Sequence, residues 1–450
     1  MRFFIAILLI FIHSQSFANA VFTVNNKDIA KTKILFIGFD QRDPYLRSPS
    51  FDIMERLRNN LKNTDLFEVI KQSAPPLNAG NASLAGKVEY PQVEIDGVPD
   101  FAKYAKAGID AVIMAKFNRD SVGNVEARVR AYDILDQRQL FGKVYTASKD
   151  SYRKVANAIS NEIFKAITGE KIGHFDSQIL YVAETGAIKN RIKRIAKIDF
   201  DGENHRYLTS GRDLVLSPVF SKKRDEIFYV RYFQNRPQIF SLNLQNLRSD
   251  KVGGFRITNF APAIHPQNPD LLLLSAIQDG NSDIYEINIT QNAARRLTKD
   301  EGIDTTASYS PDGKYIAFAS DRAGGQKLYL LTVDGYSLRR LSSGSGTYSK
   351  PIWSPDGKLI AFTKIENGQF YIGVMLADGS SERLLASGYL VEGAKFSPNS
   401  RYLVFSKKKG SWGKDSIPRL WVVDILTGHE FELPTPEDEG AIDPDWGSAN

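Results

Sequence analysis

The sequence predicts an α+β N-terminal domain followed by an all-β six-bladed β-propeller. The first observation is a nine-residue motif, SPDGKYIAF at residues 310–318, which returns as SPDGKLIAF at 354–362 and more loosely as SPNSRYLVF at 397–405. The second is the period, because the three copies start 44 and 43 residues apart. The third is that the repeat is absent from the first 170 residues. Self-similarity at this period is typical of propellers, in which each repeat forms one blade.

Each copy of the repeat predicts four short antiparallel strands, which we call A, B, C and D. Strand A lies before the Ser-Pro pair, and strand B follows the Asp-Gly pair at 315–318 and 359–362. Strands C and D follow within the same repeat. Asp312-Gly313 and Asp356-Gly357 are predicted turns, since glycine accepts positive φ and aspartate can bond its own backbone.

Weaker copies extend the repeat toward the N-terminus and bring the count to six blades. Further B strands are predicted at 271–274, 227–230 and 179–182, and further A strands at 308–309, 262–264 and 218–220. The last A-type segment is DPDW at 443–446. The first B strand has no A strand before it, and the last A strand has no B strand after it. We therefore expect the C-terminal strand to pair into the first blade and close the ring, which removes the free edges of an open array.

The sequence divides into three predicted parts: a signal peptide at 1–20, an N-terminal α/β domain at 21–171 and the propeller at 172–450. In the N-terminal domain, apolar and helical periodicities predict strands at 33–39, 67–70, 111–117, 126–135 and 139–146, and helices at 50–62, 100–107 and 150–167. The apolar line of the first helix is predicted to be Phe51, Met54, Leu57 and Leu61. Residues 73–99 are rich in Pro, Gly, Asn and Ala and predict a long connection.

The N-terminus has the pattern of a secretory signal. Arg2 is followed by an apolar run at 3–12 and by a small-x-small site at Ala18 and Ala20. Ten apolar residues are too few to cross a bilayer, and no later stretch is longer. We expect an exported protein that is soluble in the periplasm, begins near Val21 and has no membrane insertion.

Composition excludes several classes of chemistry. The chain has no cysteine, which excludes disulfides, a thiol nucleophile and a Cys-ligated metal. The formal net charge is +6, with no basic block that would indicate a nucleic-acid partner. The sequence also lacks a Gly-x-Ser-x-Gly elbow, a P-loop and a His-x-x-x-His pair. We therefore predict no catalytic residue, no cofactor and no metal.

Two other functions stay open. The chain could be an exported hydrolase or lyase that uses the acid run Glu437, Asp438 and Glu439 at the channel mouth. It could also be a propeller that acts on a separate peptidase. A charge run in one loop is more often a solvated surface, which favours a non-enzymatic protein.

Two segments are candidate docking sites. The loops that join strand D of one blade to strand A of the next meet at one mouth of the ring, with exposed aromatic candidates at Phe260, Tyr348 and Tyr389. Residues 21–31 alternate like a strand at the predicted mature N-terminus. They are expected to form either an extra edge strand or a mobile strand that another protein captures.

The repeats, the six blades, the preceding α/β domain and the signal peptide together resemble the TolB family, the periplasmic component of the Tol–Pal cell-envelope system. The resemblance implies a monomeric, non-enzymatic adaptor. Its implied partners are the lipoprotein Pal at the propeller mouth away from the N-terminal domain, TolA at the mature N-terminus, and other outer-membrane proteins. Its implied role is to maintain outer-membrane integrity and to draw the outer membrane inward during division.

Carried over by position, the resemblance also implies contact residues. The TolA-binding tail would comprise Val21, Phe22, Thr23, Val24 and Asp28. The Pal-binding face would comprise Thr258, Asn259, Ala261 and Thr305, and the exposed aromatic candidates Phe260 and Tyr348 of the same mouth are added to it, although Phe260 is bulky where the family commonly has a small residue. The repeat is degraded in two blades, where HPQN at 265–268 and SKKR at 221–224 replace SPDG.

Overall fold

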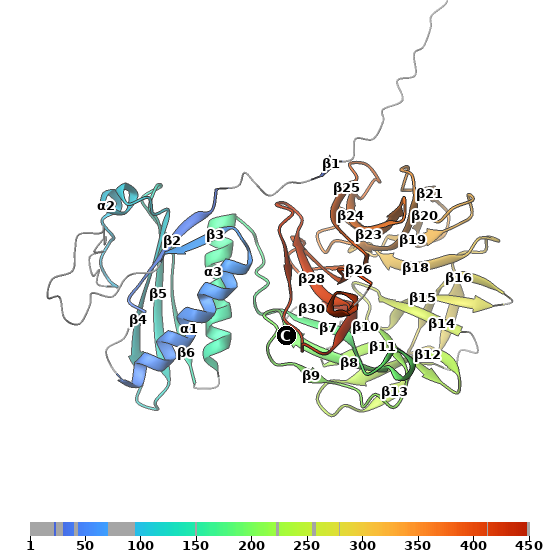
Figure 1. Ribbon diagram of the computed structural model, residues 1–450, viewed down its shortest axis with the longest axis horizontal. Coiled ribbons are helices and arrows are strands. Elements are labelled where there is room, and N and C mark those ends of the chain that lie inside the picture. Colours follow the sequence, from blue (N-terminus) through green and yellow to red (C-terminus); the bar gives the residue numbers. More distant parts are fainter. Residues whose placement is uncertain are drawn as a thin grey trace, which may run out of the picture.

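The computed structural model describes two bodies that lie side by side, the N-terminal domain and the propeller (Figure 1). It describes residues 22–23, 30–39, 44–70, 95–148, 151–221, 225–253, 258–278, 280–411 and 413–447, with side chains excepted at 22–23, 188, 258–261 and 414–415. The predicted signal peptide lies outside these residues, as do most of residues 73–99. None of the helices described is long and apolar enough to span a bilayer.

The N-terminal domain is a five-stranded sheet in the order β3-β2-β4-β5-β6. Its strands are β2 (Thr32–Ile37), β3 (Phe67–Ile70), β4 (Ala111–Arg119), β5 (Val125–Asp133) and β6 (Arg138–Ala147). Its helices are α1 (Pro44–Asn63), α2 (Phe101–Lys106) and α3 (Tyr152–Thr168). Helices α1 and α3 pack side by side against one face of the sheet (Figure 1).

Helix α1 differs from its prediction in length and in the residues that it buries. Its buried line is Ile53, Leu57 and Leu61, whereas Phe51 is 55% exposed, so the prediction for Phe51 is wrong. The helix also buries Asn60, whose amide donates to Asn157 and Ser160 of α3 at 2.9 Å. A polar pair in the helix–helix interface fixes the register of α1 on α3, because a buried amide must keep its partners.

The propeller has six four-stranded blades, and the prediction of six is confirmed. Blade 1 contains β30 (Gly440–Gly447), β7 (Gln178–Thr185), β8 (Ile192–Asp199) and β9 (Arg206–Tyr207); blade 2 contains β10 (Val215–Phe220), β11 (Glu226–Phe233), β12 (Arg236–Asn243) and β13 (Ser249–Lys251); blade 3 contains β14 (Thr258–Ile264), β15 (Leu271–Gln278), β16 (Asn281–Asn288) and β17 (Ala293–Arg296); blade 4 contains β18 (Asp304–Tyr309), β19 (Tyr315–Ser320), β20 (Lys327–Thr332) and β21 (Leu338–Arg340); blade 5 contains β22 (Thr347–Trp353), β23 (Leu359–Glu366), β24 (Gln369–Leu376) and β25 (Arg383–Gly388); blade 6 contains β26 (Leu390–Phe396), β27 (Tyr402–Lys408), β28 (Arg419–Asp424) and β29 (Glu430–Glu432).

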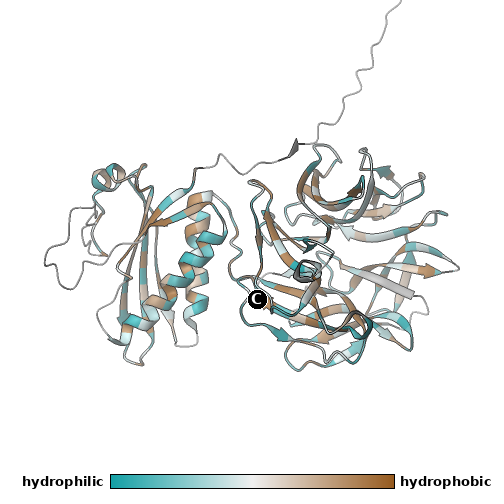
Figure 2. Cartoon of the chain, viewed as in Figure 1, coloured by the Kyte–Doolittle hydropathy of each residue, from teal (hydrophilic) through white to brown (hydrophobic). Residues whose placement is uncertain are grey.

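The ring closes as the sequence predicts. Strand β30 pairs antiparallel with β7, with Trp446 opposite Ile179. The Trp446 indole N–H donates to Ser177 Oγ at 2.7 Å, and the ring stacks on Phe200 at 5.4 Å. Apolar residues concentrate on the central strands of the blades (Figure 2), so the cores lie between neighbouring blades rather than in the channel.

The Ser-Pro-Asp-Gly motif holds the turn between strands A and B. Ser354 Oγ donates to Asp356 Oδ1 at 2.7 Å and accepts the Leu359 N–H at 2.9 Å, while Gly357 has φ of 74°. Ser310 makes the same pair of bonds in blade 4. In the looser copy Ser397 does so with Asn399 in place of the aspartate. The motif therefore recurs because one hydroxyl and one short polar side chain satisfy the turn.

The two domains share a continuous core. Phe164 of α3 packs 5.7 Å from Phe175 and 6.5 Å from Tyr402 of blade 6, measured between ring centroids. His174 is fully buried among these rings, and burial together with the nearby Arg401 lowers the pKa of His174 to about 3. The imidazole is therefore neutral at pH 7 and acts as part of an apolar contact between the domains.

Substitution of Ser354 by alanine tests the turn network. The change removes two hydrogen bonds from a fully buried hydroxyl, so the free energy of unfolding is expected to fall by about 1–2 kcal/mol. Urea unfolding of S354A and wild type measures the difference. The exposed Ser210, which accepts only a 3.4 Å contact, provides a control in S210A; equal losses for the two variants would contradict the prediction.

Candidate docking site

The N-terminal domain covers one side of the ring and leaves the other open. Arg401 in the β26–β27 turn contacts Glu170 at 3.5 Å, and Asp199 at the β8–β9 turn contacts Arg153 of α3 at 2.8 Å. The domain therefore packs on A–B and C–D turns. Because neighbouring strands in a blade are antiparallel, the D–A and B–C connections lie at the opposite side. We call that side the far mouth.

Apolar side chains project from the far mouth. They come from the D–A and B–C connections of blades 1, 2, 3, 4 and 6, and their exposed fractions run from 38% to 58%. The residues are Ile192, Leu214, Phe233, Ile277, Ile303 and Tyr389. The predicted exposure of Tyr389 is confirmed at 58%. Large exposed apolar residues gathered at one end of a molecule are typical of a protein-docking surface.

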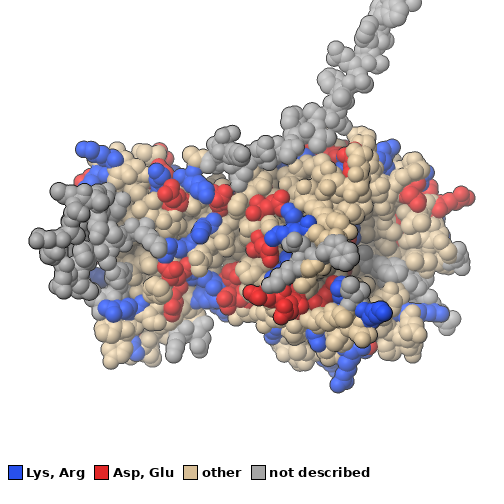
Figure 3. All heavy atoms as spheres, in the orientation of Figure 1, with Lys and Arg blue, Asp and Glu red and all other residues tan. Residues whose placement is uncertain are grey.

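Two arginines at the far mouth are compensated within the protein. Arg231 pairs with Asp213 at 2.8 Å and lies over the ring of Phe240 at 4.9 Å. Arg322 makes two bonds of 2.8–2.9 Å to the fully buried carboxylate of Asp304. On the face that Figure 3 draws, acidic and basic side chains are interspersed over both domains. Arg231 and Arg322 therefore add no uncompensated charge to the far mouth.

The predicted face residues of blade 3 lie on one strand. Thr258, Asn259, Phe260 and Ala261 belong to β14, which has a β-bulge between Phe260 and Ala263. Their side chains lie outside the described residues, so their roles stay predictions. Thr305 lies on β18 of blade 4, half-buried, and its Oγ1 accepts a 3.4 Å contact from Gln326. The structure thus places these residues on adjacent inner strands that begin at the far mouth.

The predicted exposure of Tyr348 is wrong. It was expected to be an exposed aromatic, but its side chain is fully buried. Its hydroxyl donates to Glu382 at 2.8 Å, and the Lys364 ammonium lies 5.1 Å from its ring centroid. Strand alternation points it into the blade core rather than toward the mouth, so its side chain offers no surface to a partner.

The inner strands share a strained feature that lines the central channel. Each has a β-bulge at the same height, and five of the bulges carry a residue with positive φ: Ser217, Thr306, Lys350, Gly393 and Asp443. Positive φ is unfavourable for residues with a Cβ and above all for a β-branched threonine. The bulges re-aim backbone N–H groups across the seams between blades.

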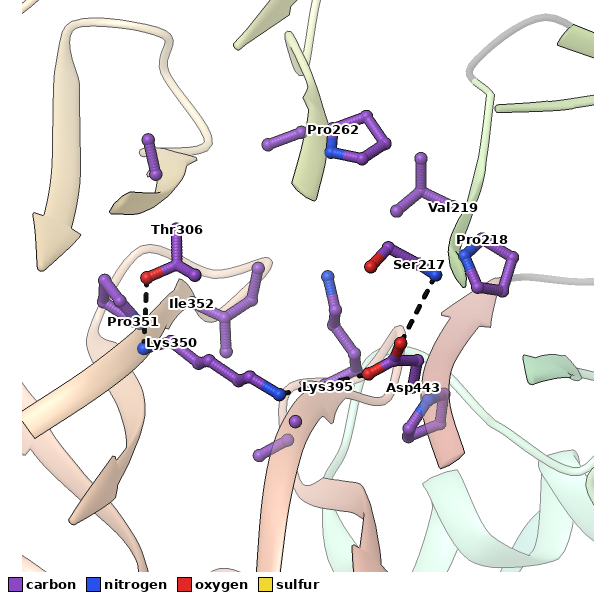
Figure 4. Close-up of a pocket in the computed structure, with 15 residues that line it drawn as sticks. Ser217, Pro218, Val219, Pro262, Thr306, Lys350, Pro351, Ile352, Lys395 and Asp443 are labelled. Atoms are coloured by element: carbon purple, nitrogen blue, oxygen red, sulfur yellow. Dashed lines mark hydrogen bonds and ion pairs between the residues drawn. The ribbon is translucent and has the colours of Figure 1, made fainter. Parts of the chain in front are cut away.

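Lys350 crosses this channel (Figure 4). Its ammonium lies 2.8 Å from Glu392 Oε2 and 3.9 Å from Asp443 Oδ1, and its backbone N–H donates to Thr306 Oγ1 at 3.3 Å. Asp443 Oδ2 accepts the Ser217 N–H at 3.4 Å. Lys350 therefore contacts three other blades, and Asp443 extends the network to Ser217 of a fifth, around a cavity of about 110 Å³. Burial alone would lower the pKa of Lys350, but Asp443 and Glu392 outweigh it and raise that pKa.

The two described residues of the predicted tail form strand β1 (Phe22–Thr23). They pair in parallel with the outer strand of blade 5, Phe22 opposite Arg383 and Thr23 opposite Leu384 (Figure 1). This is the edge-strand alternative, observed over two residues. Val21, Val24 and Asp28 lie outside the described residues, and the roles of all five tail residues stay predictions.

The acid run at 437–439 does not converge on one point. Glu437 and Asp438 are exposed. Glu439 is buried and accepts hydrogen bonds from Tyr181 at 2.6 Å and Tyr207 at 2.5 Å. Its loop is held by Arg419, which donates to the carbonyls of residues 435, 436 and 439. Glu439 therefore serves the packing of blade 1, whereas Glu437 and Asp438 face solvent. The described residues contain no cluster of three or more metal-ligating side chains.

Sequence reasoning missed Lys350 and Asp443 as partners. In both cases a charged residue stands directly before a proline on an inner strand, in KPI at 350–352 and in DPD at 443–445. This pattern was the signal that could have found them. The exposed apolar residues of the far mouth lie at strand ends. In the sequence they cannot be distinguished from the apolar residues that alternate into the blade core.

The fold and the open mouth define a class of protein, the β-propellers that carry an added α/β domain. The crystal structure of TolB from Acinetobacter baumannii matches with a TM-score of 0.79 and 24% identity, over 95% of this chain and 98% of that chain. Kuenenia stuttgartiensis hydrazine synthase matches at 0.50 and 13% over 60% and 46%. At these identities the likeness shows the fold alone.

Sequence comparison narrows the class to a family. The family model described as the TolB beta propeller domain matches residues 164–450. The Tol-Pal system protein TolB of Gluconobacter oxydans is 37% identical over 246 residues, which are 55% of this chain and 49% of that protein. In this match the chain spans about half the length of its relative. The chain belongs to the TolB β-propeller family.

Substitution of Lys350 by methionine tests the channel contacts. K350M is expected to lower the free energy of unfolding by about 1–2 kcal/mol at pH 7, because a charge-assisted bond and an ion pair are lost. The folded-state pKa is raised, so the contribution is complete below the ordinary lysine value of 10.5 and is lost as pH rises through the higher folded value.

Urea unfolding between pH 7 and pH 11 measures this difference. The control is K358M, since the Lys358 side chain is 79% exposed and makes only a 3.6 Å ion pair. A difference between wild type and K350M that grew toward high pH would contradict the assignment.

Proposed function

We propose that the protein is a non-enzymatic periplasmic adaptor of a Tol–Pal system. It would bind the lipoprotein Pal at the far mouth and TolA through residues 21–31. Its role would be to maintain the outer membrane and to help constrict it during division. Membership of the TolB β-propeller family supports the class. The observation that carries the site is the group of exposed apolar residues at the mouth that the N-terminal domain leaves open.

The character of the far mouth favours a folded protein partner. Six separated apolar side chains around a polar channel mouth suit a broad, shape-complementary contact better than a small ligand. The channel itself is narrow and crossed by Lys350. A partner would therefore rest on the loops, with its own polar groups over the channel.

The tail supports the second half of the proposal. A strand that adds to an exposed sheet edge gains main-chain hydrogen bonds, and such segments recur in protein recognition. Among the described residues, β1 pairs with β25 at two positions, and we propose that the tail exchanges this docked position for pairing with another protein. The tail would thus be held on its own propeller in one state and on TolA in the other.

Two partners that favour different positions of the tail must be coupled. If Pal binding changes the affinity of the β25 edge for the tail, then TolA binding changes the affinity for Pal by the same factor. A partner that binds equally well to both positions of the tail would not change the balance between them.

Charged substitutions at the far mouth test the Pal site. F233D, I277D and I303D each place a carboxylate in a predicted apolar contact, and each is expected to weaken Pal binding at least tenfold. Matched controls are L247D and L426D, whose parent residues are 46% and 58% exposed in C–D turns on the opposite side. Calorimetric titration with soluble Pal measures the affinities. An equal loss of Pal affinity in the controls, or no loss in the three variants, would contradict the proposed site.

Deletion of residues 21–31 tests the tail. The truncated protein is expected to lose TolA binding in a pull-down and to keep Pal binding, with a changed Pal affinity if the two sites are coupled. Full TolA binding together with an unchanged Pal affinity would show the tail to be inert.

A further inference from the structure

One connection at the far mouth is built almost entirely from serine and glycine. It joins strand D of blade 4 to strand A of blade 5, and we call residues 343–347, with the sequence SGSGT, the lip. Ser343, Ser345 and Gly346 are exposed. Glycine loses more backbone freedom on folding than any other residue, so a connection of this composition keeps one conformation only if other groups hold it.

Lys327, the first residue of β20, contacts the lip from the protein side. Its ammonium donates to the backbone carbonyl of Gly344 at 2.8 Å and to that of Gly346 at 2.6 Å. The Lys327 side chain is half-buried, and its ammonium lies 5.0 Å from the centroid of the Tyr348 ring. Hydrogen bonds with one charged partner are stronger than neutral ones. One cation therefore fixes two peptide planes of the lip.

A buried network of polar side chains supports Lys327. The Glu382 carboxylate accepts a hydrogen bond from the Tyr348 hydroxyl at 2.8 Å and another from the Lys364 ammonium at 3.0 Å. Tyr348 and Lys364 are 0% and 1% exposed, and Glu382 is 8% exposed. The Lys364 ammonium lies 5.1 Å from the centroid of the Tyr348 ring, so two cations face one aromatic ring. We call Tyr348, Lys364 and Glu382 the tyrosine network.

The tyrosine network reaches the lip at a second point. Lys364 also contacts Glu366 at 3.1 Å, and Glu366 accepts a hydrogen bond from the Ser345 hydroxyl of the lip. Burial alone would lower the pKa of Lys364, but the hydrogen bonds to Glu382, Tyr348 and Glu366 outweigh burial and raise that pKa. The Lys364 ammonium is therefore charged at pH 7, and each of its acceptors also bonds a group at or next to the lip.

The two glycines of the lip fit closely over these groups. A Cβ on Gly344 would lie 2.3 Å from the Tyr348 hydroxyl and 3.3 Å from Glu382 Oε2. Gly346 has φ of 79°, and a Cβ there would lie 2.5 Å from the carbonyl oxygen of Ile365. Close packing of this kind leaves no space for a larger residue. The lip therefore rests directly on the tyrosine network.

We propose that Lys327 and the tyrosine network position the lip, holding it in one conformation before any partner binds. A buried polar network whose members are all hydrogen-bonded makes its surroundings rigid. The lip then presents a preformed polar contact among the apolar residues of the far mouth, and a partner does not have to order a glycine-rich segment. Tyr348 acts on recognition in this way without touching the partner. This last step rests on the proposed docking of Pal at the far mouth.

Nitrogen-15 relaxation of the full chain, without any partner, measures whether the lip is held. The lip amides of the wild type are expected to have order parameters of about 0.85, as in rigid backbone. K327M removes both hydrogen bonds to lip carbonyls and is expected to lower these values below about 0.6. K327R keeps a charged donor and is expected to restore most of the order. The control K358M changes a lysine whose side chain is 79% exposed and is expected to leave the lip unchanged.

Two further substitutions test the lip from its other contacts. Y348F removes only the hydroxyl that donates to Glu382 and is expected to lower the order parameters to a smaller extent. G344A adds a methyl group that cannot fit over the Tyr348 hydroxyl and is expected to displace the lip. Its control is G325A, because a Cβ on Gly325 would have nothing within 4 Å. Unchanged order parameters in K327M or in Y348F, or equal effects of G344A and G325A, would overturn the proposal.

Calorimetric titration with soluble Pal separates the positioning of the lip from the proposed Pal site. K327M is expected to weaken Pal binding about tenfold through a less favourable binding entropy, because the partner must then order the lip. K327R is expected to restore the affinity, which a general loss of packing would not do.

The outcomes distinguish two failures. If F233D weakened Pal binding and K327M did not, the Pal site would stand and the role of the lip in recognition would be wrong. If neither variant weakened Pal binding, the Pal site itself would be wrong, and the order parameters would still decide whether Lys327 and the tyrosine network hold the lip.

Discussion

The pairing of β30 with β7 is the contact on which the rest of the structure depends. It joins residues 256 to 269 positions apart, and the Tyr181–Glu439 hydrogen bond supports the same blade from just outside β30. Because the last strand completes the first blade, every blade has two neighbours and every seam must be satisfied at once. The bulges of the inner strands and Lys350 act between blades, and the Lys350–Asp443 ion pair forms because closure brings β30 back beside the other inner strands.

Closure also separates the two sides of the ring. The N-terminal domain packs on the A–B and C–D turns of blades 1 and 6 through a continuous core of aromatic rings. The turns on that side also carry exposed apolar residues, such as Leu247, Tyr336 and Leu426, so what sets the far mouth apart is that the described part of the N-terminal domain leaves it uncovered (Figure 1). Arg231 and Arg322 there are paired with Asp213 and Asp304, so these two cations would add little to the binding of the proposed partner.

The propeller could be predicted because its sequence motif repeats, whereas the contacts between blades could not be predicted. Six blades, the closing strand and the Asp-Gly turns follow from local patterns that recur at a fixed spacing. Tyr348 shows the limit: its position in a loop-like segment suggested exposure, but β22 begins one residue earlier and turns the ring inward. The partners of Lys350 lie on three other blades, and no spacing in one sequence reports which inner strands face one another across a channel.

Blade 5 connects the two proposed binding regions. Its outer strand β25 accepts the tail on its free edge and ends at Gly388, and Tyr389 follows at once as an exposed residue of the far mouth. A tail that lengthens its pairing along β25 would move toward this loop, while a partner that holds Tyr389 would fix the end of the strand. Coupling between the regions therefore needs no rearrangement of the ring. It requires only that the free energy of binding at the six-residue strand β25 depends on whether the other region is occupied. That dependence is the minimum that linkage requires.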